Sequence, residues 1–159
     1  MDWAIGNGHL LVIEWLHTNR IKGCCPNSLY YAAENGHLSV LKWLRTNHPE
    51  LGGTWLMTEA AKNGHLSVVE WLHANPTKNS CARESMNKAA MNGHLHVVEW
   101  LHVNRSEGCT AAMHLAAENG HLSVLKWLRT NHPELGGTWL MTEAAKNGHL
   151  SVVEWLHAN

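Results

Sequence analysis

Histidine is the residue type in this chain with the greatest chemical potential, because the 159 residues include 14 histidines beside only 4 cysteines. Imidazole and thiolate groups are common zinc ligands and common catalytic bases or nucleophiles. Six of the histidines belong to the tetrapeptide Asn-Gly-His-Leu, which begins at Asn7, Asn35, Asn63, Asn92, Asn119 and Asn147. A catalytic or metal site is usually singular, so a histidine that occurs in every copy is expected to be structural.

The remaining histidines do not have the spacing of a metal site. Four of them, His17, His73, His102 and His157, occupy one repeated position, which is Arg45 and Arg129 in the other two copies. A position that accepts either His or Arg is not a zinc ligand, because a guanidinium group cannot coordinate the metal. His48, His96, His114 and His132 form no ligand pattern either. We therefore expect no metal and no cofactor.

The cysteines also give no strong sign of catalysis. Cys24 and Cys25 are adjacent, whereas Cys81 and Cys109 are isolated, which matches neither a zinc pattern nor a disulfide framework. The adjacent pair could be redox-active, but two ordinary loop cysteines are the favoured interpretation. The chain has no Gly-x-Gly-x-x-Gly or Walker-type phosphate loop. We expect a non-enzymatic protein in a reducing intracellular compartment, cytoplasmic or nuclear.

Charge and hydropathy exclude two further classes of partner. The formal net charge is -1 and no block of Lys and Arg stands out, so nothing favours binding to nucleic acid. The longest apolar stretches are only a few residues, which is too short to cross a membrane. The 45% content of hydrophobic residues is typical of a folded protein.

The spacing of the tetrapeptide predicts the architecture. Successive copies are separated by 28, 28, 29, 27 and 28 residues, and a period of this size is typical of a solenoid. We predict a single repeat domain over residues 1–159. Its repeats span approximately residues 1–25, 26–53, 54–82, 83–109, 110–137 and 138–159.

The third copy shows how each repeat should fold. Thr54 is a plausible N-cap for a short helix that continues to Lys62. Its predicted buried face carries Leu56, Met57, Ala60 and Ala61, and its polar face carries Thr58, Glu59 and Lys62. Gly64 should end this helix, because glycine adopts the left-handed conformation without steric cost. A second helix is expected from about Leu66 to Ala74.

The second helix is apolar over more than half of its circumference, so it should be buried on several sides. Its tryptophan recurs as Trp15, Trp43, Trp71, Trp100, Trp127 and Trp155, and we expect a buried ridge between repeats. An exposed aromatic groove is the alternative. An asparagine follows in every copy, at Asn19, Asn47, Asn75, Asn104, Asn131 and Asn159, where it should stop the helix in the left-handed conformation.

The segment Ala-Ala-Glu-Asn-Gly-His-Leu-Ser-Val-Leu-Lys-Trp-Leu, at Ala32–Leu44 and again at Ala116–Leu128, resembles the helix–turn–helix part of ankyrin repeats. The paired alanines, the Gly-His-Leu turn and the Val-Val-x-x-Leu pattern at Val68–Leu72 carry the resemblance. It extends over the whole chain, and the short Trp-Leu-His units are similar to those of oomycete arrays. The resemblance implies an all-α, ankyrin-like solenoid of six helix–turn–helix repeats that binds other proteins.

The period departs from the 33 residues that are usual in that family. The deficit falls in the connections, so the β-hairpin fingers of the family should be shortened or absent. The binding surface that the resemblance implies is then reduced to the concave face of the first helices and the short loops.

Two columns of first-helix residues vary among the copies in the way that a recognition surface would. We predict a protein-binding concave face formed by Trp3, Tyr31, Glu34, Glu59, Lys62, Lys88, Met91, Leu115, Glu118, Glu143 and Lys146, with Gly6 in the same columns. The column two residues earlier is uniformly apolar, with Met1, Leu29, Met57, Met86, Met113 and Met141. An ordinary solvated surface that has drifted without selection is the alternative. Trp55 and Trp139 could add aromatic contacts, although packing on Leu51 and Leu135 is favoured.

A block of 44 residues is duplicated, since residues 32–75 are identical to residues 116–159. Identical stacking faces specify register poorly, so we expect domain swapping by a slip of three repeats or end-to-end self-association. Neither end carries a polar capping repeat, and Val152, Val153 and Trp155 should be partly exposed. A structural or regulatory array without a ligand, as a fragment or an engineered assembly, is the alternative function.

Overall fold

The computed structural model describes residues 1–19, 23–53, 55–76, 82–104, 110–133 and 137–159. These residues form α-helices and turns, without a strand. The helices are α1 (Asp2–Gly6), α2 (Leu10–Thr18), α3 (Ser28–Glu34), α4 (Leu38–Asn47), α5 (Leu56–Lys62), α6 (Leu66–Ala74), α7 (Ala82–Met91), α8 (Leu95–Asn104), α9 (Thr110–Glu118), α10 (Leu122–Asn131), α11 (Thr138–Lys146) and α12 (Leu150–Ala158). The all-α prediction is confirmed.

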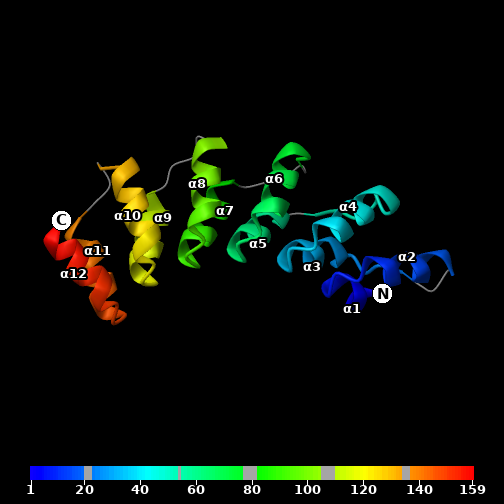
Figure 1. Cartoon of the computed structure of the whole chain (residues 1–159), viewed down its shortest axis with the longest axis horizontal. Helices are drawn as coiled ribbons and strands as arrows, with labels where there is room; N and C mark the ends of the chain where they lie inside the picture. Colours follow the sequence, from blue (N-terminus) through cyan, green and yellow to red (C-terminus); the bar gives the residue numbers. More distant parts are fainter. Residues whose placement is uncertain (20–22, 54, 77–81, 105–109, 134–136) are drawn as a thin grey trace. The chain divides into compact units, whose positions relative to one another are not determined.

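The chain divides into two compact units, Met1–Cys81 and Ala82–Asn159, and each contains three helix pairs. In the first unit α3 packs between α1 and α5, while α4 packs on α6 behind them. In the second unit α9 packs between α7 and α11, and α8 packs on α10. Figure 1 shows the alternation of first and second helices within each unit. The prediction of a single repeat domain over the whole chain stays a prediction.

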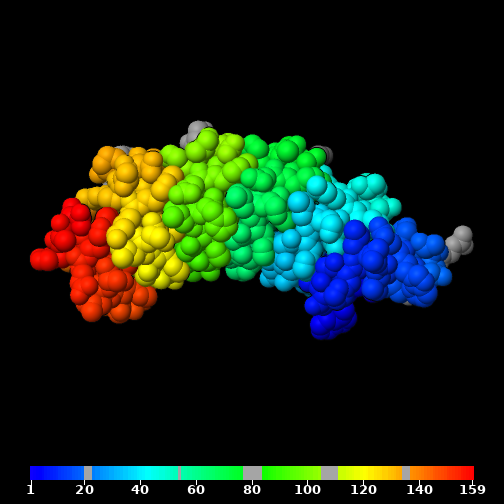
Figure 2. Space-filling model, viewed as in Figure 1, coloured from blue at the N-terminus to red at the C-terminus, as the bar shows by residue number. Residues whose placement is uncertain are grey.

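The core of each unit consists of small and branched side chains. The paired alanines Ala32 and Ala33 are fully buried in α3, and Val40, Leu41 and Leu44 are fully buried in α4. Alanine has no bulk beyond its methyl group, so neighbouring first helices can approach closely. Figure 2 shows the residues of each unit packed in sequence order along its surface.

The predicted buried face of α5 is confirmed, because Leu56, Met57, Ala60 and Ala61 are all buried. The assignment of Thr58 to the polar face was wrong, since only 3% of this side chain is exposed. The helix packs against both α3 and α6, so a short helix of this kind has little free circumference. The proposed N-cap, Thr54, lies outside the described residues.

The turn between the helices of a pair confirms the expected role of its glycine. The six glycines, Gly8, Gly36, Gly64, Gly93, Gly120 and Gly148, have φ angles between 73° and 78°. Such angles are costly for any residue with a Cβ atom. A Cβ atom on Gly36 would also lie 2.5 Å from Nδ1 of His65, so the next repeat packs directly on this backbone.

In four of the turns, the histidine joins one repeat to the preceding one. The imidazole Nε2 of His65 lies 3.0 Å from the carbonyl oxygen of Glu34, at the end of the preceding first helix. Equivalent contacts of 2.9–3.0 Å join His37 to Gly6, His121 to Met91 and His149 to Glu118. The structural interpretation is therefore confirmed for these four histidines.

The second-helix asparagines do not adopt the left-handed conformation, so that prediction was wrong. Asn19 and Asn75 have φ angles of -85° and -126°. Instead, the amide Nδ2 of all six residues donates to the carbonyl oxygen of the tryptophan four residues earlier, at 2.8–3.0 Å. A side-chain donor can satisfy a terminal carbonyl without reversing the backbone.

The prediction of a buried tryptophan ridge was also wrong. Trp15 is 60% exposed, and the other five second-helix tryptophans are half-buried. Trp43 packs edge-to-face on His17 of the preceding repeat, with ring centroids 5.1 Å apart, and Trp127 packs on His102 in the same way. The valine and leucine side chains already fill the space between helices, so the indole rings lie at its margin.

Candidate recognition surface

The variable columns of the first helices are accessible in the structure. Trp3 is 88% exposed, Tyr31 is 36% exposed and Lys146 is exposed, while the remaining members are half-buried. By contrast, Leu29, Met57, Met86 and Met113 of the apolar column are buried. Met1 and Met141 in that column are only half-buried. The two kinds of column therefore differ in accessibility as well as in chemistry.

Several charged or titratable residues on this surface form short-range pairs. Lys62 lies 3.2 Å from Glu59 in α5, and Lys146 lies 3.4 Å from Glu143 in α11. Hydrogen bonding to Glu59 and the charge of this carboxylate raise the pKa of Lys62. His114 lies 3.7 Å from Glu118 in α9, and Lys88 lies 3.7 Å from Glu84 in α7. These contacts are partly exposed, so each stabilises the fold little.

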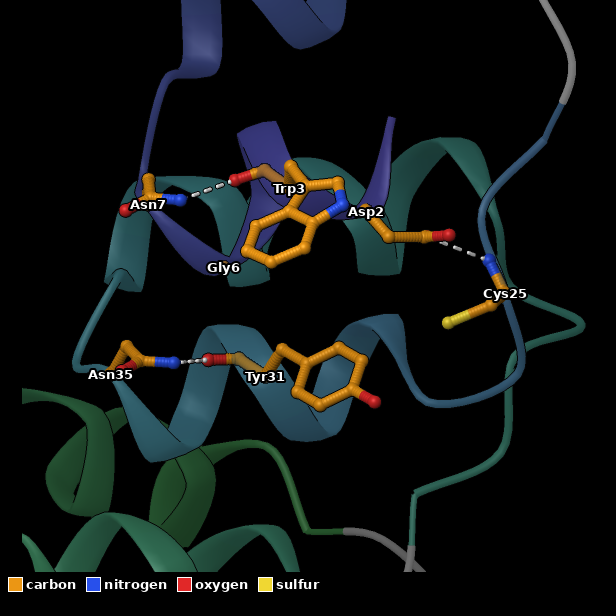
Figure 3. Close-up of a pocket in the computed structure, with 7 residues that line it drawn as sticks. All are labelled: Asp2, Trp3, Gly6, Asn7, Cys25, Tyr31 and Asn35. Atoms are coloured by element: carbon orange, nitrogen blue, oxygen red, sulfur yellow. Dashed lines mark hydrogen bonds between the residues drawn. The ribbon is translucent and has the colours of Figure 1, made fainter.

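A groove opens on this surface between α1 and α3 (Figure 3). It has a volume of about 490 Å³, and it is lined by Asp2, Trp3, Gly6, Asn7, Cys25, Tyr31 and Asn35. Three of these residues, Trp3, Gly6 and Tyr31, belong to the two variable columns. The side chains of Trp3 and Tyr31 come from neighbouring first helices and lie on the same side of them. Two of the seven residues that line the groove are therefore aromatic.

Asp2 joins the two repeats at one end of the groove. Its Oδ1 atom accepts hydrogen bonds from the backbone N–H of Cys25, at 3.0 Å, and from the hydroxyl group of Ser28, at 3.2 Å. Burial acts to raise the pKa of Asp2, but these hydrogen bonds and the nearby chain amino group outweigh it and lower the pKa. The carboxylate is thus charged at neutral pH.

The adjacent cysteines have the environment of ordinary thiols. Both are free, and Cys24 Sγ contacts the sulfur of Met1 at 3.4 Å. Burial, followed by the charge of Asp2, raises the pKa of Cys24, which disfavours the reactive thiolate form. Cys81 and Cys109 lie outside the described residues. Within the described part of the chain, no three His, Cys, Asp or Glu side chains form a group that could hold a metal ion.

Sequence reasoning missed four residues that line the groove, namely Asp2, Asn7, Cys25 and Asn35. The two asparagines belong to the repeated turn, where their amides donate to the carbonyls of Trp3 and Tyr31 at 2.7 and 2.9 Å. Cys25 lies in the connection between repeats, and the repeat pattern does not predict the position of residues in a connection. The position of Asp2, directly before Trp3, was the one signal that could have pointed to it.

The two exposed tryptophans beside the Gly-Gly turns differ from each other despite their identical local sequence. Trp55 precedes α5 with a left-handed φ of 66°, whereas Trp139 lies inside α11. The ring of Trp139 packs on His114, with centroids 4.7 Å apart. Leu135 lies outside the described residues, so packing of Trp139 on that residue stays a prediction.

Sequence profiles of ankyrin repeats match most of the chain. The profile described as "Ankyrin repeats (3 copies)" matches residues 57–138 and 86–159, and "Ankyrin repeats (many copies)" matches residues 1–45. The chain belongs to the ankyrin repeat family. Its fold is a helical solenoid of the ankyrin type, and ankyrin repeats generally mediate protein–protein interactions without catalysis.

A solved ankyrin structure supports this assignment at the level of the fold. The human ASB11 ankyrin repeat domain superposes on the chain with a TM-score of 0.74 and 21% sequence identity. The match covers 99% of this ankyrin chain and 81% of the other. No curated protein sequence matches significantly. In the described residues, none of the helices has the length and apolar character that a membrane crossing requires.

Proposed function

We propose that this ankyrin array is a non-enzymatic scaffold that binds a protein partner through the first-helix surface. One observation carries the proposal: the variable columns are accessible, while the adjacent column is apolar and buried in the inner repeats. A rigid scaffold that displays side chains of mixed chemistry is suited to selective recognition, in which a few aromatic or charged residues dominate the affinity.

The groove between α1 and α3 adds weight to this proposal. It offers two accessible aromatic rings, a charged carboxylate and a concave shape within one small area. Tyrosine and tryptophan are enriched at the energetic centres of protein interfaces. The free thiols of Cys24 and Cys25 favour a reducing, intracellular compartment as the place of this interaction.

A pair of matched surface variants tests the proposal. The first variant combines Trp3→Ala, Lys88→Ala and Leu115→Ala on the first helices. The control combines Trp15→Ala, Lys126→Ala and Leu11→Ala, which removes the same residue types from the second helices. Binders selected from a peptide display library on the intact chain should lose more than about tenfold in affinity for the first variant only.

Two outcomes would contradict the proposal. Equal losses for both variants would show that the first-helix surface has no special role. A failure to select any specific binder would favour the alternative, a structural or regulatory array without a ligand of its own. Circular dichroism of both variants separates loss of binding from loss of folding.

A further inference from the structure

The groove between α1 and α3 combines aromatic faces with negative charge. Asp2 is the one titratable acid or base among its lining residues apart from the thiol of Cys25 and the phenol of Tyr31. No Lys, Arg or His side chain lines it in the described structure. The faces of Trp and Tyr rings carry negative electrostatic potential, so they attract cations as a carboxylate does. Three of the lining residues, Asp2, Trp3 and Tyr31, can thus attract positive charge.

The hydrogen bonds of Asp2 leave it able to act on a ligand. Both bonds are accepted by Oδ1, from Cys25 and Ser28, and they fix the carboxyl group at the end of the groove. Neutral donors of this kind orient a carboxylate without cancelling its charge. The preorganised carboxylate can therefore attract a cation without a further loss of side-chain freedom.

The surrounding first-helix surface of this unit is also acidic. The variable columns of α3 and α5 contribute Glu34, Glu59 and Lys62, and Lys62 is paired with Glu59 at 3.2 Å. Glu34 directly precedes Asn35, which lines the groove. With Asp2, this surface has three carboxylates and two positive groups, the ammonium group of Lys62 and the amino group of Met1, so one negative charge is in excess. The charge of this surface complements a basic segment rather than an acidic one.

Building on the proposed function, we infer that the groove binds the cationic side chain of an Arg or Lys residue in the partner protein. The aliphatic part of such a side chain packs against Trp3 and Tyr31. Its guanidinium or ammonium group then lies over the aromatic rings and within reach of Asp2. Cation–aromatic contacts of this type contribute binding free energy even at exposed sites.

Blocked pentapeptides with one variable central residue flanked by glycines test the inference by NMR titration of the isotope-labelled full chain. Arginine and lysine peptides should shift the indole N–H signal of Trp3 and the amide signals around Cys25. Peptides with central norleucine or glutamate should bind much more weakly, because they lack the positive charge. Trp3→Leu and Tyr31→Leu should each weaken arginine binding by roughly 3-fold to 10-fold.

Trp139→Leu is the matched control, because this exposed tryptophan lies in α11 and does not line the groove. It should leave arginine binding unchanged. Acetylation of the Met1 amino group, which acts electrostatically on Asp2, should strengthen binding because it removes a competing positive charge. Equal binding of norleucine and arginine peptides, or no shift of Trp3 at saturating peptide, would overturn the inference.

The outcome for the proposed function is separable from this result. If a selected partner still depends on the first-helix surface while the arginine peptide fails to bind, only the cation inference is wrong. If the arginine peptide binds at Trp3 while partner binding ignores the first-helix variant, the proposed function is wrong.

Discussion

The repeated histidine has a chemical role that is not catalytic. In four copies its ring Nε2 bonds to the carbonyl oxygen of the last residue of the preceding first helix, so one side chain provides a partner for a terminal carbonyl and joins two repeats. Each of these histidines also packs on a glycine that has no room for a Cβ atom at four described turns. The tetrapeptide therefore serves to pack each repeat against its neighbour.

His65→Ala should destabilise the first unit by about 1–2 kcal/mol, because the Glu34 carbonyl loses its partner. The matched control is His9→Ala, since His9 is exposed on the first repeat and should contribute almost nothing. Urea unfolding followed by circular dichroism measures both effects. A loss for His9→Ala as large as that for His65→Ala would contradict the role of the cross-repeat contact.

Asp2 should make a small pH-dependent contribution to stability. Its pKa in the folded chain lies below the ordinary value of 3.8, so the contribution is fully present above that value. It is lost as the pH falls through the lower, folded pKa. The free energy of unfolding of Asp2→Asn should therefore converge with that of the original chain in acid and lie below it at neutral pH, by less than about 1 kcal/mol. Parallel curves at all pH values would refute the prediction.

At the residue scale, the sequence predicted which positions repeat but not what every side chain does. The periodicity placed the histidines and glycines correctly because their roles depend on backbone geometry that every copy shares. It failed for the second-helix tryptophans, since hydrophobicity alone cannot tell a ring at the margin of a core from one inside it. It also failed for Asn75, which caps the helix without the left-handed conformation, because its backbone N–H and its side-chain amide both donate to the Trp71 carbonyl.

At the scale of helices, the turn glycines adopt the left-handed conformation that joins the two helices of a repeat. Gly36→Ala should destabilise the fold by more than about 1 kcal/mol, because the left-handed φ is strained for alanine and the new methyl group displaces the ring of His65. Gly148→Ala should show the φ cost alone, since a Cβ atom there would meet nothing within 4 Å. Gly52→Ala, with open space and no positive φ, should be neutral or slightly stabilising. Thermal melts of the three variants measure this order.

The bounds of the second helices followed from the sequence more accurately than those of the first helices. The segment Leu66–Ala74 was predicted and is observed as α6. The start of the first helix was not predictable, because the same residues begin α11 at Thr138 but begin α5 only at Leu56. Identical sequence with two starting points shows that local propensity alone does not decide where this helix begins.

At the scale of the whole molecule, the duplicated block should compromise folding fidelity. His65 contacts the Glu34 carbonyl and His149 contacts the Glu118 carbonyl, both at 3.0 Å, so the two copies offer interchangeable stacking partners. Refolding at high protein concentration should therefore yield domain-swapped dimers that size-exclusion chromatography separates from the monomer. A single monomeric peak at all concentrations would argue against exchange.

The first and last repeats differ in how far their apolar side chains are exposed. Val152 is fully buried, contrary to the prediction, while Val153 and Trp155 are half-buried as predicted. In the first repeat, Leu11, Val12 and Trp15 are 81%, 49% and 60% exposed. The equivalents of Val12 in the other copies, such as Val40 and Val68, are fully buried. The sequence could identify the stacking residues but not which of two neighbours covers each one.

The six Asn-Gly turns are also sites at which the chain can undergo deamidation. Asn-Gly deamidates when the glycine nitrogen attacks the asparagine amide carbon, expels ammonia and leaves an aspartate or isoaspartate after hydrolysis. Here each asparagine amide donates to a helix carbonyl at 2.7–3.0 Å, and each glycine N–H donates to another at 3.1–3.3 Å. Both reacting groups are therefore held in place. Mass spectrometry should detect deamidation mainly in chains kept unfolded. The extent of deamidation at these turns should therefore increase with the time that a molecule spends unfolded.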